Sequence, residues 1–197
     1  MADFTATIRQ HLAMADDRGN PPHVRGRACE MAVAHMFRSV PGCETELNQL
    51  DYYRSSEVDL IVSNDRHPKG LRLLPEFFLV ECKHYTKPVT SMVVRDFRAK
   101  IQDRNCDLGV LLAANGVTGN AVDRRAAYHA ATCALNQQIE ILLLTRDDLA
   151  ALRSSADVVR LLHERRRQLK SSTTFPDLQR PRHAPSLALD AGQLELF

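Results

Sequence analysis

The sequence predicts an α/β domain with a mixed β-sheet, followed by a flexible C-terminal tail. The first observation is an alternation along the chain between helical periodicity and short apolar runs typical of strands. The second is composition: 197 residues, 44% hydrophobic and 25% charged, suit one soluble globular domain with a sizeable core. The third is a change after Lys170, where prolines recur and no hydrophobic period is sustained. We therefore expect a domain over residues 1–170 and a tail over 171–197.

The expected elements follow from periodicity and from helix and strand breakers. Residues 1–22 are polar and end in an Asn-Pro-Pro break, so no element is assigned there. Helices are expected where apolar residues recur three or four positions apart, and strands where they alternate or run continuously. The expected helices cover 23–37, 90–105, 118–135, 146–152 and 155–170, and the expected strands cover 56–63, 76–83, 108–114 and 138–144.

Several protein classes are excluded by composition. No apolar run approaches the length of a membrane span, and the first residues lack the basic and apolar segments of a secretory leader. We therefore expect a cytoplasmic protein with no membrane partner. Five cysteines without a CxxC spacing argue against a disulfide framework or a four-cysteine zinc site. The net charge of +2 is too mild to indicate a nucleic-acid partner. Basic clusters at 93–104 and 160–170 fit either solvated helix faces or phosphate-contacting ones.

The run FFLVECKHY ends an apolar strand in charged residues. Because strand side chains alternate between faces, Leu79, Glu81 and Lys83 should share one face, with Cys82 on the other. In the preceding strand, Asp59 should share a face with Glu57 and Ile61, opposite Val58, Leu60 and Val62. If these two strands pair, Asp59 and Glu81 can converge.

Two converging carboxylates between apolar walls are costly unless a positive charge compensates them. Hard oxygen ligands suit Mg²⁺, which binds one or two carboxylates and keeps several waters. Such an ion can activate water and polarise a phosphoryl oxygen, and Lys83 can orient that water. The pattern therefore indicates metal-assisted hydrolysis of a phosphodiester. A purely structural ion pair among Asp59, Glu81 and Lys83 is the alternative.

The segments EVDLIV and VECK together resemble the signature of the PD-(D/E)xK nuclease superfamily. Val58 stands where many members have proline. The resemblance implies that Asp59, Glu81 and Lys83 are catalytic. It also implies that Asp59, Glu81 and the backbone carbonyl of Cys82 bind Mg²⁺, with Mn²⁺ as a substitute.

Residues 23–145 resemble the Mrr-like restriction endonuclease branch more closely. This resemblance depends on the segment RGRACEMAVAHMF, on a helix after the lysine, and on a buried strand that ends in small residues. The resemblance implies a restriction-endonuclease-like core, in which a central mixed sheet is flanked by helices. It implies Glu30 as a further metal ligand, because such helices often add a glutamate. The candidate DNA contacts are His84, Tyr85, Lys87 and, as the helix glutamine of relatives, Gln102; the first three suit ordinary loop residues equally well.

The function expected from this resemblance is Mg²⁺-dependent cleavage of DNA, in defence against foreign DNA or in DNA repair. A homodimer or a larger defence complex would be compatible with it. One alternative is a structure-specific nuclease similar to a junction resolvase. The other is a DNA- or clamp-binding module that is derived from a nuclease and does not cleave.

The last residues, GQLELF, resemble the peptide by which bacterial replication and repair proteins hold the sliding clamp. A flexible peptide can present Leu and Phe anchors to an apolar pocket while a glutamine amide fixes its register. The residues concerned are Gln193, Leu194, Leu196 and Phe197. The alternative is that Leu196 and Phe197 fold back onto the core of their own domain.

Overall fold

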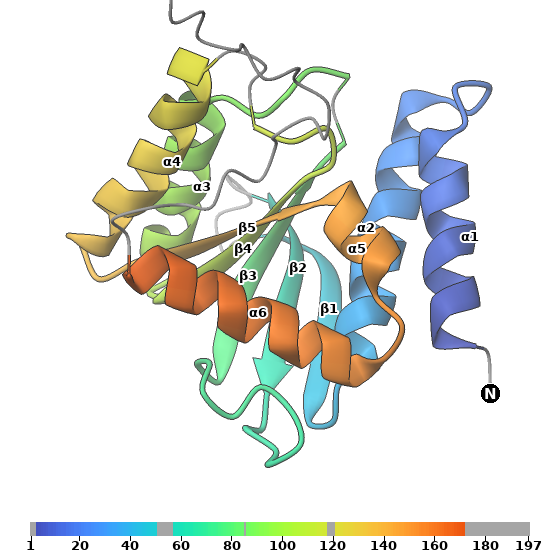
Figure 1. The fold of residues 1–197 in the computed structure, drawn as a ribbon, viewed down its shortest axis with the longest axis horizontal. Helices are drawn as coiled ribbons and strands as arrows, with labels where there is room; N and C mark the ends of the chain where they lie inside the picture. The colour runs from blue at the N-terminus through green and yellow to red at the C-terminus, as the bar shows by residue number, and fades with distance from the viewer. Residues whose placement is uncertain (1–2, 51–56, 85, 118–120, 172–197) are drawn as a thin grey trace, which may run out of the picture.

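The computed structural model describes residues 3–50, 57–84, 86–117 and 121–171. Within them, one five-stranded sheet has the order β1-β2-β3-β4-β5 (Figure 1). Its strands are Cys43–Leu50, Glu57–Asn64, Phe77–Lys83, Leu108–Ala113 and Glu140–Thr145. Helices α1 to α6 are Phe4–Asp16, Pro22–Arg38, Ser91–Asp103, Ala121–Leu135, Arg146–Ala151 and Ser155–Lys170. The strands β1, β2 and β3 pair antiparallel, whereas β3, β4 and β5 pair parallel.

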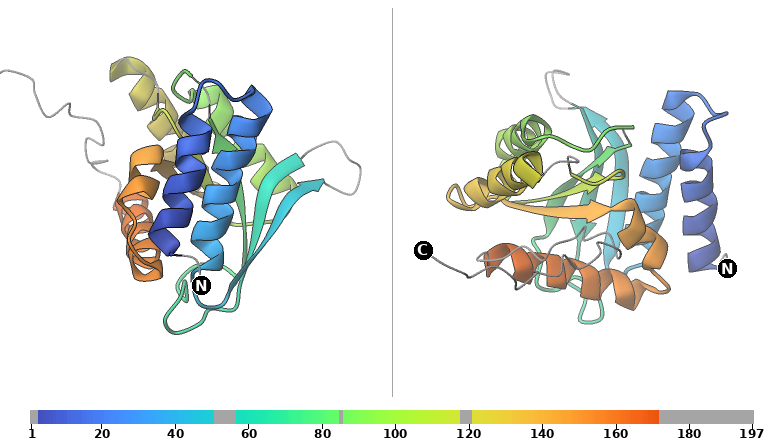
Figure 2. Two further views of the ribbon diagram at one scale, coloured as in Figure 1. Left: turned by 90° about the vertical axis from the view of Figure 1, so that its right-hand side faces the viewer. Right: turned by 45° about the horizontal axis from the view of Figure 1, so that its top comes forward.

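Helices cover both faces of this sheet (Figure 2). Helices α1, α2, α5 and α6 contribute to one apolar core, which includes Phe37, Leu60, Phe78 and Leu162. Helices α3 and α4 contribute to a second core on the other face. Two covered faces explain why β4 is buried at every position. The expected α/β architecture, a mixed sheet flanked by helices, is confirmed.

Two elements were not predicted from the sequence. Helix α1 buries Ile8, Leu12 and Ala15, which recur at helical spacing, so the signal for this helix was present in the sequence. Strand β1 has the sequence CETELNQL, with only Cys43 fully buried and the rest half-buried or exposed in alternation. Strand β1 was therefore hard to predict because its apolar signal is weak, whereas the helical spacing in α1 was overlooked.

Basic residues of α6 are neutralised within the domain. Arg165 binds Asp148 at 2.7 Å, Arg166 binds Glu140 at 2.5 Å, and Lys170 binds the same Glu140 at 2.7 Å. These pairs tie α6 to α5 and β5, so this part of the basic cluster at 160–170 has a structural role.

Helix α6 ends at Lys170, next to the expected domain boundary. The expected tail, with the clamp-like residues Gln193, Leu194, Leu196 and Phe197, lies almost wholly outside the described residues, so the domain division stays a prediction. In the described part of the chain, no helix is both long enough and apolar enough to span a membrane.

Candidate active site

The strands β2 and β3 separate at the residues that the sequence singled out. Their antiparallel register runs from Ser63 opposite Phe77 to Leu60 opposite Val80. Continued by one residue, it would place Asp59 opposite Glu81. Instead, the Asp59 carboxylate accepts a hydrogen bond from the backbone N–H of Cys82 at 2.6 Å. The side chain of Asp59 thereby bridges the two strands where regular backbone pairing ends.

A change in backbone direction accompanies this separation. On the other side of β2, Leu47 pairs with Leu60 and Gln49 pairs with Val58, so Asn48 lies opposite Asp59. Asn48 has a φ of 54°, a left-handed conformation that interrupts a regular strand.

The expected side-chain alternation is wrong at Val58. Leu60 and Val62 pack in the core of α1, α2, α5 and α6, whereas Val58 packs in the core of α3 and α4. Local distortion around Asp59 accounts for this, because strict alternation would place all three side chains on one face.

Glu81 is a buried carboxylate with two lysine partners. Its side chain is on the α3 side of β3, and the residue is only 2% exposed. Its Oε1 lies 2.6 Å from Nζ of Lys83 and 2.9 Å from Nζ of Lys100 on α3. Its other oxygen, Oε2, is buried and has no hydrogen-bond partner among the described residues. A buried carboxylate oxygen without a partner is costly, so this atom is available to a further ligand.

The carboxylates of Glu81 and Glu30 both influence the ionisation of Asp59. Burial, together with the negative charge of Glu81, raises the pKa of Asp59 to about 6, although the N–H of Cys82 and the charge of Lys83 act in the opposite direction. Glu30 on α2 adds a smaller effect that also raises this pKa. Glu30 itself is paired with Arg27 at 2.9 Å, and Arg27 also donates to the side chain of Asn48 at 2.6 Å.

The donor atoms at this place suit a hard divalent cation. Asp59 and Glu81 offer carboxylate oxygens, and Glu81 Oε2 lacks a partner among the described residues. Within that same part of the chain, no three His, Cys, Asp or Glu side chains are grouped closely enough to hold a metal ion by themselves. Mg²⁺ commonly binds to one or two carboxylates and completes its coordination with waters and substrate phosphates, so the residues fit such an ion.

Comparison with known protein families agrees with this geometry. A family model named Mrr_cat, described as restriction endonuclease, matches residues 23–153. The chain belongs to this restriction endonuclease family. It therefore contains a nuclease domain of the restriction-endonuclease type, and the resemblance seen in the sequence is confirmed. A search of curated proteins found no match to the chain.

Cys82 is unsuited to act as a nucleophile in this nuclease domain. Its side chain packs toward the core on the α2 side, away from Glu81. A hydrogen bond with the thiol of Cys29, followed by burial, raises the pKa of the Cys82 thiol well above its usual value. Because the thiolate is the reactive form, these surroundings argue against cysteine hydrolase chemistry.

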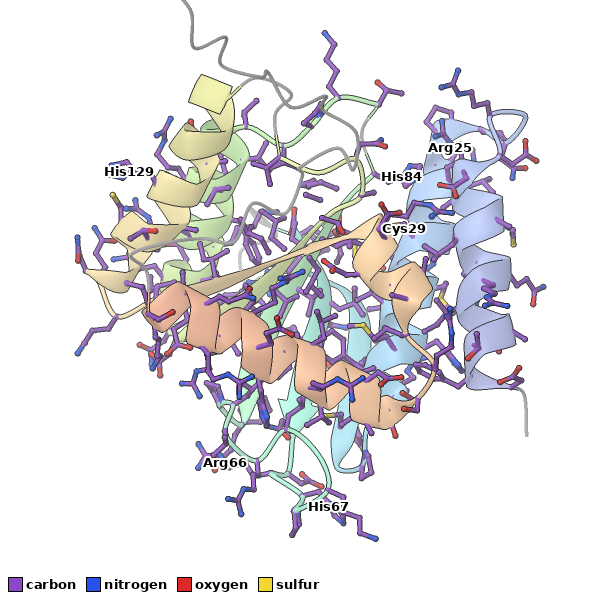
Figure 3. The ribbon with its side chains drawn as sticks, in the orientation of Figure 1. Arg25, Cys29, Arg66, His67, His84 and His129 are labelled. Carbon is purple, nitrogen blue, oxygen red and sulfur yellow. The ribbon has the colours of Figure 1, made fainter. Side chains whose placement is uncertain are left out.

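The candidate DNA contacts occupy different environments. His84 is largely buried, with Nε2 3.8 Å from the Asp16 carboxylate of α1. In Figure 3 it lies with Cys29 between the sheet and the α1–α2 pair, whereas Arg66 and His67 lie at the opposite end of the molecule. Lys87 and Gln102 are exposed, so both remain accessible to a ligand. Tyr85 lies outside the described residues.

Lys100 is the site residue that sequence reasoning missed. It lies three positions after Phe97, which is buried on the inner face of α3. A lysine at that spacing can lie on the same helix face, so the signal was present in the sequence. The helix glutamine considered from the resemblance, Gln102, is exposed, and it is Lys100 that reaches Glu81.

The pair His129 and Cys133 on α4 is remote from this site. Cys133 Sγ lies 3.3 Å from His129 Nε2, as expected for residues one helical turn apart. His129 lies on the far side of the molecule from His84 (Figure 3). Two ligands alone do not make a structural zinc site, which requires four.

Proposed function

We propose that this nuclease domain is a Mg²⁺-dependent DNA endonuclease, with Mn²⁺ as a substitute ion. The observation that carries the proposal is the meeting of Asp59, Glu81 and Lys83 where β2 and β3 separate. The unpartnered oxygen of Glu81 among the described residues supports a cation at this place. Defence against foreign DNA or DNA repair is the proposed setting, by analogy with the family.

Asp59, Glu81 and the backbone carbonyl of Cys82 would hold the cation, and Glu30 would add negative charge from α2. When bound, a divalent cation polarises the phosphoryl oxygen and makes water a better nucleophile. Lys83 would orient the attacking water and offset the negative charge that develops on the phosphoryl group. The water oxygen forms a bond to phosphorus, the ester P–O bond breaks, and the leaving oxygen takes a proton.

The position of Lys83 supports this role. Its ammonium is held 2.6 Å from Glu81 Oε1, and its side chain retains partial exposure. The lysine is therefore fixed beside the carboxylate yet accessible from solvent. A positioned ammonium that costs no reorganisation during the reaction is an effective stabiliser of developing charge.

The experiment is cleavage of supercoiled plasmid by the full chain with and without Mg²⁺. Glu81→Gln and Lys83→Met are each expected to lower the rate by about 100-fold or more, because they remove a ligand and a transition-state charge. Lys69→Met, at an exposed lysine of the β2–β3 loop, is the matched control and should cleave at the wild-type rate.

The result that contradicts the proposal is wild-type cleavage by Glu81→Gln or Lys83→Met. Linear duplex, branched DNA and RNA serve as parallel substrates. Cleavage confined to branched DNA would indicate a junction-resolving nuclease. Tight DNA binding without cleavage under any metal condition would indicate a binding module.

A further inference from the structure

Lys100 connects β2 and β3 where they separate. Its Nζ donates to the backbone carbonyl of Glu57 on β2 at 2.8 Å and to Oε1 of Glu81 on β3 at 2.9 Å. Helix α3 holds the lysine in place, because Phe97 and Ile101 are buried against the sheet. Its ammonium group therefore occupies a position that the fold determines.

Positive and negative groups balance around Glu81 before any cation is added. Asp59 and Glu81 carry two formal negative charges, and Lys83 and Lys100 carry two formal positive ones. Glu30, which also influences Asp59, is already paired with Arg27. A divalent cation would therefore add two positive charges beyond those that these described side chains balance. In a partly buried site, such charges repel each other more strongly than in water.

We propose that the positive charge of Lys100 keeps the affinity of the free protein for Mg²⁺ low, so that the ion binds strongly only together with a DNA phosphate. This inference rests on the proposed function. The phosphate supplies the missing negative charge and an oxygen ligand. By linkage, Mg²⁺ then strengthens DNA binding by the same factor as DNA strengthens Mg²⁺ binding.

A lysine that only held Glu81 in place would behave differently. Its removal would leave the Glu81 side chain less ordered, and Mg²⁺ binding would weaken. Removal of a nearby positive charge has the opposite effect, because the repulsion between the ammonium and the cation is lost. The direction of the change in Mg²⁺ affinity therefore separates the two roles.

The first experiment measures Mg²⁺ binding to the full chain without DNA, by calorimetry. Lys100→Gln keeps a hydrogen-bond donor but removes the charge, and it should bind Mg²⁺ roughly tenfold more tightly than wild type. Lys100→Arg keeps the charge and should match wild type, as should the exposed control Lys69→Gln. Glu81→Gln should weaken binding, which assigns the measured heat to this site. Unchanged or weaker Mg²⁺ binding by Lys100→Gln would overturn the proposal.

The second experiment needs no variant and so does not depend on whether a variant folds. Mg²⁺ binding to the wild-type chain is measured with and without a short unmodified DNA duplex, which keeps both the backbone charge and the phosphate oxygens, and the duplex is checked to be uncut after each titration. The duplex should strengthen Mg²⁺ binding about tenfold or more; equal affinities would overturn the proposal. Failure of the proposed function can be told apart from failure of this inference. In that case the wild-type protein would cleave no nucleic acid, while its Mg²⁺ affinities with and without the duplex would still differ.

Discussion

Asp59 is a carboxylate whose surroundings favour its protonated form. Its pKa rises from 3.8 to about 6 through burial and the charge of Glu81. The folded state therefore holds this proton more tightly than the unfolded state does. The stabilisation of the fold by the protonated Asp59 carboxyl group is complete below about pH 4 and is lost as the pH rises through about 6. Without metal, the ionised carboxylate thus destabilises the fold at neutral pH.

Asp59→Asn should consequently stabilise the metal-free protein at neutral pH. The amide oxygen can still accept the N–H of Cys82, while the repulsion from Glu81 is lost. The gain over wild type should increase between pH 4 and 7, to at most about 3 kcal/mol. Urea unfolding at several pH values measures it, with Asp96→Asn at an exposed position of α3 as control. A gain that is independent of pH would contradict this account of Asp59.

At the scale of elements, the contact between α3 and β4 sets the position of Lys100. A Cβ at Gly109 of β4 would lie 2.4 Å from Cδ1 of Ile101 and 2.7 Å from the ring of Phe97. Both are buried α3 side chains, so the helix approaches β4 more closely than any residue other than glycine at position 109 would allow. Gly109 therefore fixes how far α3, with Lys100, stands from Glu81.

Gly109→Ala should push α3 away from the sheet. The overpacking should lower the free energy of unfolding by about 1–3 kcal/mol, and displacement of Lys100 should break its contact with Glu81. Gly26→Ala is the matched control, because nothing lies within 4 Å of the added methyl group; in helix α2 it should stabilise by roughly 0.5–1 kcal/mol. Urea unfolding of both variants measures these changes. Equal stability of Gly109→Ala and wild type would show that α3 is not held by this contact.

The strands and helices differ in how much of their structure the sequence could predict. Strands β3 and β4 have long apolar runs, and their bounds and burial agree with expectation. The Asp59 carboxylate accepts the N–H of Cys82, the residue between Glu81 and Lys83, while the roles expected for these residues stay predictions. Local patterns could not reveal the left-handed conformation of Asn48 or the sheet face toward which Val58 packs. Both features arise where two strands separate in three dimensions. Lys100 was missed for a related reason. Its role depends on acceptors 19 and 43 residues away in the chain.

At the scale of the whole molecule, helix α1 supports the segment after Lys83 from outside the part matched by the family, residues 23–153. Its Asp16 carboxylate lies 3.8 Å from His84, which directly follows Lys83, and binds Arg146 of α5 through Nε at 2.7 Å. One carboxylate thereby connects α1, the end of β3 and α5. Helix α1, which lies outside the matched region, is thus joined to the end of β3 by polar contacts as well as by apolar packing.

The clamp-like residues at the end of the sequence lead to a prediction about the full chain. Leu196 and Phe197 would be the anchors of such a peptide, and anchors of this kind contribute about 2 kcal/mol or more each. The double variant Leu196→Ala/Phe197→Ala should therefore weaken binding to a purified bacterial sliding clamp by roughly 100-fold or more. Surface plasmon resonance measures this, with Leu187→Ala/Leu189→Ala in the same segment as control.

A second measurement on the same variants separates the two interpretations of these residues. If Leu196 and Phe197 instead pack on the domain's own core, their truncation should lower the free energy of unfolding by about 2–5 kcal/mol each. A clamp-binding peptide gives the opposite pattern, because its anchors are solvated until the clamp is bound: clamp affinity falls and the urea midpoint stays at the wild-type value. Loss of stability with no clamp binding by wild type would therefore reject the clamp proposal, and it would leave the nuclease assignment of residues 23–153 intact.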